Sequence, residues 1–100
     1  MMEGTASVAS DVLASYAADA ALEVDGVRGL VERRMPRQAG VRIEEEDGRA
    51  TVELHVELEW GASAEAIGRE VQRRVADYLE KMAGARPAAV NVVIDAIGPP

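Results

Sequence analysis

The residues from Thr51 to Trp60 alternate between apolar and polar side chains without a break. The apolar residues are separated by a threonine, a histidine and three glutamates. Because successive side chains of a strand point to opposite faces of a sheet, this pattern predicts a strand with one apolar and one acidic face. Such a strand needs a second apolar layer to cover it, so the chain is constrained to a layered fold built on a sheet.

The next segment, residues 63–82, has helical periodicity. Its apolar residues recur every three or four positions and form one stripe: Ile67, Val71, Val75, Tyr78, Leu79 and Met82. Ser63 is a favourable N-cap and Gly84 a favourable C-terminal stop. Residues 90–97 are again rich in β-branched side chains. A strand–helix–strand unit of this length predicts a parallel crossover.

Asp47-Gly48 predicts the tight turn of a hairpin that extends from residue 41 to residue 60. With this turn, the apolar pairs fall on one face of the hairpin and an opposite-charge pair falls on the other. The predicted register contains four pairs: Glu46 with Arg49, Ile43 with Val52, Arg42 with Glu53 and Val41 with Leu54.

The first thirty residues predict a loose terminus, a helix and a short strand. Residues 1–9 are small and polar, and we expect them to be flexible. Ser10 is the expected cap of a helix that ends near Glu23. The predicted apolar face of this helix contains Val12, Leu13, Tyr16, Ala17 and Ala20. Alternation of Val27, Gly29 and Val31 predicts a weak first strand, and Gly26 and Gly29 are expected to allow a close approach of helix and strand.

Together these elements predict one α+β domain over residues 10–98, in the order α-β-β-β-α-β. We expect a two-layer sandwich with a four-stranded mixed sheet and two helices on one of its faces. The other face of the sheet would be largely open. The order of the strands in the sheet does not follow from the sequence.

Composition excludes several classes of function. The chain has 100 residues, a net charge of −7 and no cysteine, which excludes disulfides, thiolate catalysis and the usual structural zinc sites. The acidic balance argues against binding to nucleic acid or to anionic lipid. The N-terminus lacks a signal-peptide pattern, and no apolar run approaches the roughly 20 residues of a membrane span. We therefore expect a cytoplasmic protein without direct membrane insertion, which reaches the membrane only through a partner.

Charged residues of the predicted open face form a candidate interaction surface, together with a basic cluster between the first two strands. These residues are Glu44, Glu53, His55, Glu57, Glu59, Arg33, Arg34 and Arg37. The acidic part is either a docking surface for a basic partner segment or a solvated outer face that keeps the domain soluble. The arginines could pair with the acidic face of a neighbouring subunit, which hints at self-association.

His55 with Glu53 and Glu57 could in principle form a metal site, because residues i and i±2 of a strand share a face. Three ligands from a single strand are splayed too far apart, and a fourth ligand is not evident. No pocket or orienting partner is predicted that would make His55 a general base. We therefore assign no catalytic, metal-binding or cofactor-binding residue and expect a protein that is not an enzyme.

An ordered set of segments resembles the alkaline shock protein family, the small envelope-stress-response proteins of Gram-positive bacteria. The segments are residues 20–30, 40–41, 52–61, 70–75, 82–84 and 90–92, so the resemblance extends over roughly residues 10–97. Two residues depart from the family pattern. Trp60 stands where the family usually has tyrosine, and Ala83 stands where it has threonine.

The resemblance implies a non-enzymatic cytoplasmic protein of the envelope stress response. It implies a homo-oligomer that gathers near the membrane by binding a small membrane-anchored protein, with no cofactor. Two other functions remain as alternatives. One is a small RNA-binding α/β module, although the basic groove or glycine-rich clamp that this needs is not visible. The other is a small enzyme that uses His55 and carboxylates.

Overall fold

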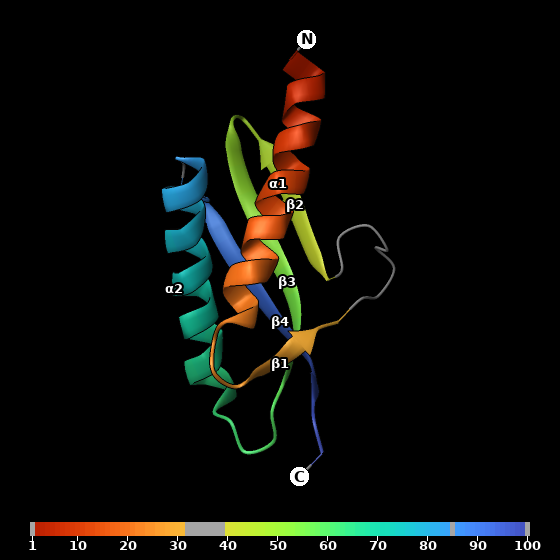
Figure 1. Ribbon diagram of the computed structural model, residues 1–100, viewed down its shortest axis with the longest axis vertical. Coiled ribbons are helices and arrows are strands. Elements are labelled where there is room, and N and C mark those ends of the chain that lie inside the picture. The colour runs from red at the N-terminus through yellow and green to blue at the C-terminus, as the bar shows by residue number, and fades with distance from the viewer. Residues whose placement is uncertain (1, 32–39, 85, 100) are drawn as a thin grey trace.

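The computed structural model of the protein describes residues 2–31, 40–84 and 86–99 and has the predicted order of elements (Figure 1). The elements are α1 (Met2–Leu22), β1 (Val27–Leu30), β2 (Val41–Glu46), β3 (Arg49–Leu58), α2 (Ala64–Ala83) and β4 (Ala89–Ile97). Both helices lie on the same side of the sheet (Figure 1). The predicted α+β two-layer architecture is confirmed.

β3 is the central strand of the sheet, and this settles the strand order that the sequence left open. β2 pairs antiparallel with residues 49–54 of β3, and β1 pairs antiparallel with residues 56–58. β4 pairs parallel with residues 51–58 of β3. Because β4 shares partners with both other strands, β1 and β2 must lie end to end along one edge of β3, and β4 takes the opposite edge.

The hairpin has the predicted register at every pair, from Glu46 opposite Arg49 to Val41 opposite Leu54. Its turn residues, Asp47 and Gly48, have positive φ angles of 55° and 77°. This is the backbone of a type I′ turn, whose twist matches that of the flanking strands. The predicted parallel pairing of the third and fourth strands is also confirmed.

β1 contains a bulge that the alternation of the sequence did not indicate. Val27 lies opposite Leu58, but Gly29 lies opposite Glu57 and Leu30 opposite Val56. The register shift turns Leu30 toward the core, where it packs beside the buried residues. The predicted strand is present, but its residues do not keep a simple alternation after Val27, because one extra residue reverses the facing of every residue that follows.

The two glycines near β1 have different roles. Gly26 has a φ of 98°, and a Cβ atom built there would collide with Cδ1 of Ile67 on α2. A Cβ on Gly29 would meet no atom within 4 Å. The prediction of a close approach between the first helix and the strand is therefore wrong: the close approach is made by α2 at Gly26, and Gly29 has no such neighbour.

The core lies between the sheet and the helices and is aliphatic. The inward side chains of β3 are all 0% exposed: Val52, Leu54, Val56 and Leu58. Helix α2 contributes a branched stripe of Val71, Val75 and Leu79, whereas α1 contributes mainly alanines: Ala14, Ala17, Ala20 and Ala21. Small side chains let α1 approach the other elements closely. The rings of Tyr16 and Tyr78 join the helices in an edge-to-face contact with centroids 5.8 Å apart.

Three residues predicted on buried faces are exposed. Val12 lies on the outer side of α1, Met82 is in the last turn of α2, and Trp60 follows the end of β3. Trp60 is 63% exposed because the strand ends at Leu58, and beyond the strand the alternation no longer determines to which side a side chain points.

Helix α1 begins at Met2, so the prediction that Ser10 caps this helix is wrong. Ser10 lies inside the helix, and its hydroxyl donates to Glu45 over 3.4 Å. The predicted caps of α2 are confirmed, since Ser63 Oγ accepts from the backbone N–H of Ala66 and Gly84 has a φ of 78°. The flexibility of residues 1–9 stays a prediction.

Candidate interaction surface

The face of the sheet opposite the helices presents charged side chains from all four strands. On β3 the outward residues are Glu53, His55 and Glu57, which alternate with the buried apolar residues. Glu44 on β2 lies opposite the outward Thr51. Four of the predicted surface residues are therefore brought to one face. Glu59 is exposed but follows the end of β3, and Arg33, Arg34 and Arg37 lie outside the described residues.

His55 is at the centre of this face and contacts a carboxylate at each ring nitrogen. Nε2 lies 2.6 Å from Oε2 of Glu53, and Nδ1 lies 2.8 Å from Oδ2 of Asp95. The His55 and Asp95 side chains are only 15% and 11% exposed. A neutral imidazole donates through one nitrogen alone, so two carboxylate partners favour the doubly protonated ring.

The same contacts raise the pKa of His55 above its ordinary value. The hydrogen bond with Glu53 has the largest effect, and the hydrogen bond and charge of Asp95 act in the same direction. Partial burial of the ring opposes them by disfavouring the charged form. The net result is a raised pKa, so the cationic form of His55 persists to a higher pH than it does in a free histidine.

Asp95 is the functional-site residue that the sequence did not indicate. The pairing of β3 with β4 shifts register between Val56 and Glu57, so that Ile94 pairs with Val56 and Ala96 with Glu57. Asp95 is the extra residue at this irregularity, directed to the outer face beside His55. A lone carboxylate among β-branched residues was the available signal, but its partner depends on the strand register, which the sequence leaves open.

The remaining carboxylates of the face have cations beside them. Glu57 lies 3.6 Å from Nε of Arg28, and Glu44 lies 2.8 Å from the guanidinium of Arg42. The open face therefore alternates in charge and is not a uniformly acidic surface. Mixed charge in fixed positions gives specificity to a contact between proteins more than it gives raw affinity.

The arrangement does not converge on a metal ion. Glu53 and Asp95 lie at different nitrogens of the same ring, so they cannot approach one ion together with His55. Glu57, the third residue considered for such a site and rejected, is directed to Arg28. Within the described ranges no group of three or more histidine, cysteine or acidic residues is placed to hold a metal.

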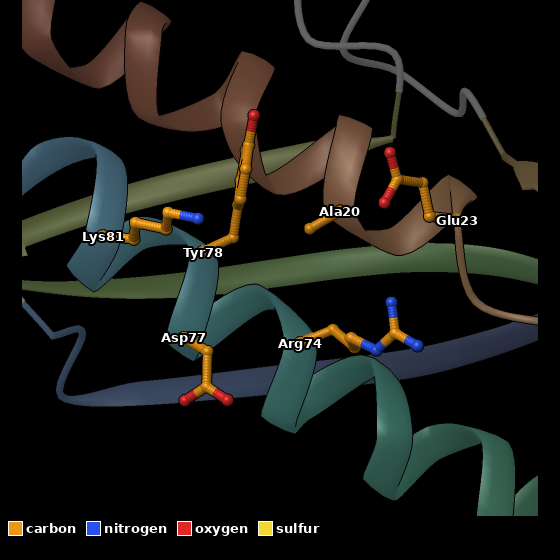
Figure 2. Close-up of a pocket in the computed structure, with 6 residues that line it drawn as sticks. All are labelled: Ala20, Glu23, Arg74, Asp77, Tyr78 and Lys81. Carbon is orange, nitrogen blue, oxygen red and sulfur yellow. The ribbon is translucent and has the colours of Figure 1, made fainter.

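A small hollow lies between the two helices, on the side of the molecule away from the open face. It measures about 180 Å³ and is lined by Ala20, Glu23, Arg74, Asp77, Tyr78 and Lys81. Figure 2 shows the Tyr78 ring standing toward α1, whereas the Asp77 carboxylate points away from α1. Asp77 is engaged by Arg86 at 3.1 Å. These residues make a shallow depression of mixed charge.

A model of the alkaline shock protein family matches residues 1–99, and the function described for that family is cell envelope-related. This chain belongs to the alkaline shock protein family. The match extends over nearly the whole chain and confirms the resemblance drawn from the sequence segments. No curated protein matches the chain significantly. In the part of the chain that the structure describes, neither helix is long and apolar enough to cross a membrane.

Solved structures with a similar fold include several variants of MamM. One MamM variant has a TM-score of 0.64 and 19% identity, with 85% of this chain and 93% of that chain covered. A second variant, of the MamM C-terminal domain, has a TM-score of 0.65 and 20% identity, with 87% and 94% covered. A zinc form of that domain has a TM-score of 0.63 and 20% identity, with 85% and 82% covered. At this identity the likeness shows the fold alone.

Proposed function

We propose that this family member is a non-enzymatic interaction protein of the envelope stress response. In this proposal it acts in the cytoplasm, associates with itself and binds a small membrane-anchored protein. The observation that carries the proposal is the open face of the sheet, where charged residues of both signs lie side by side and neither described helix covers them (Figure 1). The cell envelope-related function of the family supports the setting.

The contacts of His55 make this face suitable for recognition. Its ring is positioned by hydrogen bonds at both nitrogens and is only 15% exposed. Side chains held in place before binding lose little conformational freedom when a partner docks. The face is therefore better suited to binding a folded partner than a loosely solvated set of charges would be.

The charge pattern also supports self-association. Arg28 and Arg42 lie on the same face as Glu57 and Glu44, each arginine close to a carboxylate. A two-fold contact brings the same surface of two copies together, so such a face can pair its cations with the carboxylates of the second copy. Opposite charges placed in this way also set the register of the contact.

The test combines sedimentation of the purified protein with affinity capture from a detergent-solubilised membrane fraction. We expect a concentration-dependent oligomer and recovery of a small integral membrane protein. The double substitution Glu44→Lys with Glu57→Lys should abolish both. The matched control is Glu65→Lys on α2, because Glu65 is also an exposed carboxylate paired with an arginine, Arg69, at 2.9 Å, but lies in the helical layer.

Two results would contradict the proposal. One is a monomer at all concentrations that captures no membrane protein. The other is equal loss of both properties in the control variant, which would mean that the open face has no special role.

A further inference from the structure

The outer edge of β4 is a long strand edge without a strand beside it. Among the described strands, β4 pairs only with β3. The strand has nine residues, and its first six, Ala89–Ile94, include neither proline nor a charged residue. Proteins usually protect such edges with charges, proline or covering segments, because unpaired peptide groups recruit further strands. This edge is therefore open to another strand.

The contact between Gln72 and Val90 shows which peptide groups face outward. The Gln72 side-chain amide on α2 donates to the Val90 carbonyl over 3.0 Å, so this carbonyl is directed to the outer edge. Alternate residues of a strand direct their peptide groups to the same edge, so Val92 and Ile94 present theirs outward as well. The Gln72 amide itself mimics the first hydrogen bond that an added strand would make.

A groove of about 680 Å³ lies between this edge and α2, and all the charged side chains of the described residues that line it are cationic. The described residues that line it include Arg69, Arg73 and Arg86 and no carboxylate. Their side chains are 67%, 60% and 52% exposed. The groove is thus a positively charged strip beside an unpaired strand edge, in a chain that is acidic as a whole.

The arginines can exchange their present carboxylate partners for those of a ligand. On α2, Arg69 contacts Glu65 at 2.9 Å, and Arg73 contacts Glu70 at 2.7 Å and Asp77 at 3.6 Å. Arg86 contacts Asp77 at 3.1 Å and Glu80 at 2.7 Å. Exposed pairs of this kind exchange readily because they contribute little free energy. A guanidinium has five N–H donors, so Arg69, with one described carboxylate partner, can also take a second.

We infer that the β4 edge and the arginine groove bind an extended acidic segment of a partner protein as an added strand. The peptide groups of the segment would pair with those of residues 90, 92 and 94, and its carboxylates would reach the three arginines. A second copy of β4 fits less well, since its one acidic residue, Asp95, is already bound to His55. The inference rests on the proposed function and adds to it a second contact site, at the edge of the sheet beside the open face.

The experiment is a fluorescence anisotropy titration with a labelled octapeptide that alternates glutamate and threonine, added to the full chain. We expect saturable binding that weakens as salt rises. A peptide with lysine in place of glutamate should not bind up to about 1 mM. An acidic peptide with N-methyl groups on alternate backbone amides should also fail to bind, because it cannot complete the ladder.

Two protein variants form a matched pair. Arg73 and Arg74 both contact Glu70, at 2.7 and 2.8 Å, but only Arg73 lines the groove. Arg73→Gln should weaken peptide binding roughly fivefold or more, whereas Arg74→Gln should change it less than about twofold. Circular dichroism establishes that both variants stay folded.

Equal effects of the two substitutions, or binding of the N-methylated peptide, would overturn the inference. The inference would also be overturned if the β4 edge paired only with a second copy of the chain. This would be observed as a dimer that the acidic peptide does not dissociate. The inference and the proposed function can fail separately. Capture of a membrane protein that Arg73→Gln does not reduce would contradict only the inference. Peptide binding without any such capture would contradict only the proposed function.

Discussion

The two faces of β3 use consecutive residues of one strand for different purposes. The inward residues Val52, Leu54 and Val56 are completely buried and belong to the apolar core. The outward residues Glu53, His55 and Glu57 keep partial contact with water and are held by hydrogen bonds and ion pairs. The inward face is stabilised by the amount of apolar area removed from water, whereas the outward face depends on particular partners and on protonation.

The largest expected effect comes from the inward face. Leu54→Ala should reduce the free energy of unfolding by about 2–5 kcal/mol, because it leaves a cavity at a fully buried position. Urea denaturation measures this loss. The control on the outward face is Val93→Ala. The Val93 side chain is 37% exposed, so this substitution should reduce the free energy of unfolding by only about 0.5–1 kcal/mol. Equal losses of unfolding free energy in the two variants would show that the two faces contribute alike to stability.

The next largest loss of stability is expected at Asp95, the least exposed carboxylate of the outward face. Asp95→Asn keeps the shape of the side chain but removes the charge that contacts Nδ1 of His55 at 2.8 Å. We expect a loss of about 1–2 kcal/mol near pH 6, where the ring is charged. Denaturation at that pH measures it. A loss that persists unchanged in a His55→Gln background would mean that Asp95 acts through another contact.

The charge of His55 should make the outward face sensitive to pH. The pKa of His55 is raised above 6.5 in the folded protein, chiefly by Glu53. The stabilisation by its carboxylate partners is therefore fully present below the unfolded pKa of 6.5 and is lost as the pH rises through the folded pKa. Unfolding free energies from about pH 5.5 to about pH 8.5 should show this decrease, and His55→Gln should remove it.

The titration can be observed directly, since His55 is the only histidine of the chain. Its ring resonances in proton NMR should give a midpoint above 6.5. Glu53→Gln should lower this midpoint more than Asp95→Asn does, because the hydrogen bond with Glu53 is the larger cause of the raised pKa. The reverse order would place the dominant contact at Nδ1.

The smallest effect is expected at Gly29, opposite Glu57 on the outward face. A Cβ atom there meets nothing within 4 Å. Gly29→Ala should therefore raise the free energy of unfolding by about 0.4–1 kcal/mol, since alanine restricts the unfolded chain. Thermal unfolding compares it with Gly26→Ala, which should be clearly destabilising because φ is 98° and Ile67 blocks the site. A destabilised Gly29→Ala protein would show that β1 tolerates less change than its open surroundings imply.

Sequence reasoning succeeded where a local pattern was complete. The hairpin register follows from Asp47-Gly48 together with the alternation on both strands, and the ends of α2 follow from Ser63 and Gly84. It failed where a single residue interrupts a pattern. The bulge after Val27 turns Leu30 inward, and the irregularity at Asp95 brings that carboxylate to His55. Gly29 and the lone carboxylate of Asp95 stand at these places in the sequence, but neither fixes the register of the strands.

The candidate surface was predicted only as a set of outward charges. Alternation was sufficient to place Glu53, His55 and Glu57 on one face of the sheet. It could not supply their partners, because Asp95 and Arg28 come from distant parts of the chain. The arginine groove was not predicted at all, since it forms where α2 and residues 86–91 come together.

By itself the sequence determined the kinds of elements, their order, the hairpin register and which face of β3 is buried. These features depend on side-chain periodicity and turn chemistry, which act over a few residues. Only the tertiary structure decided that β4 lies at a free edge and that His55 is bound between two carboxylates. Both depend on the pairing of strands far apart in the chain, where many registers satisfy the same local pattern and only packing of the whole core selects one.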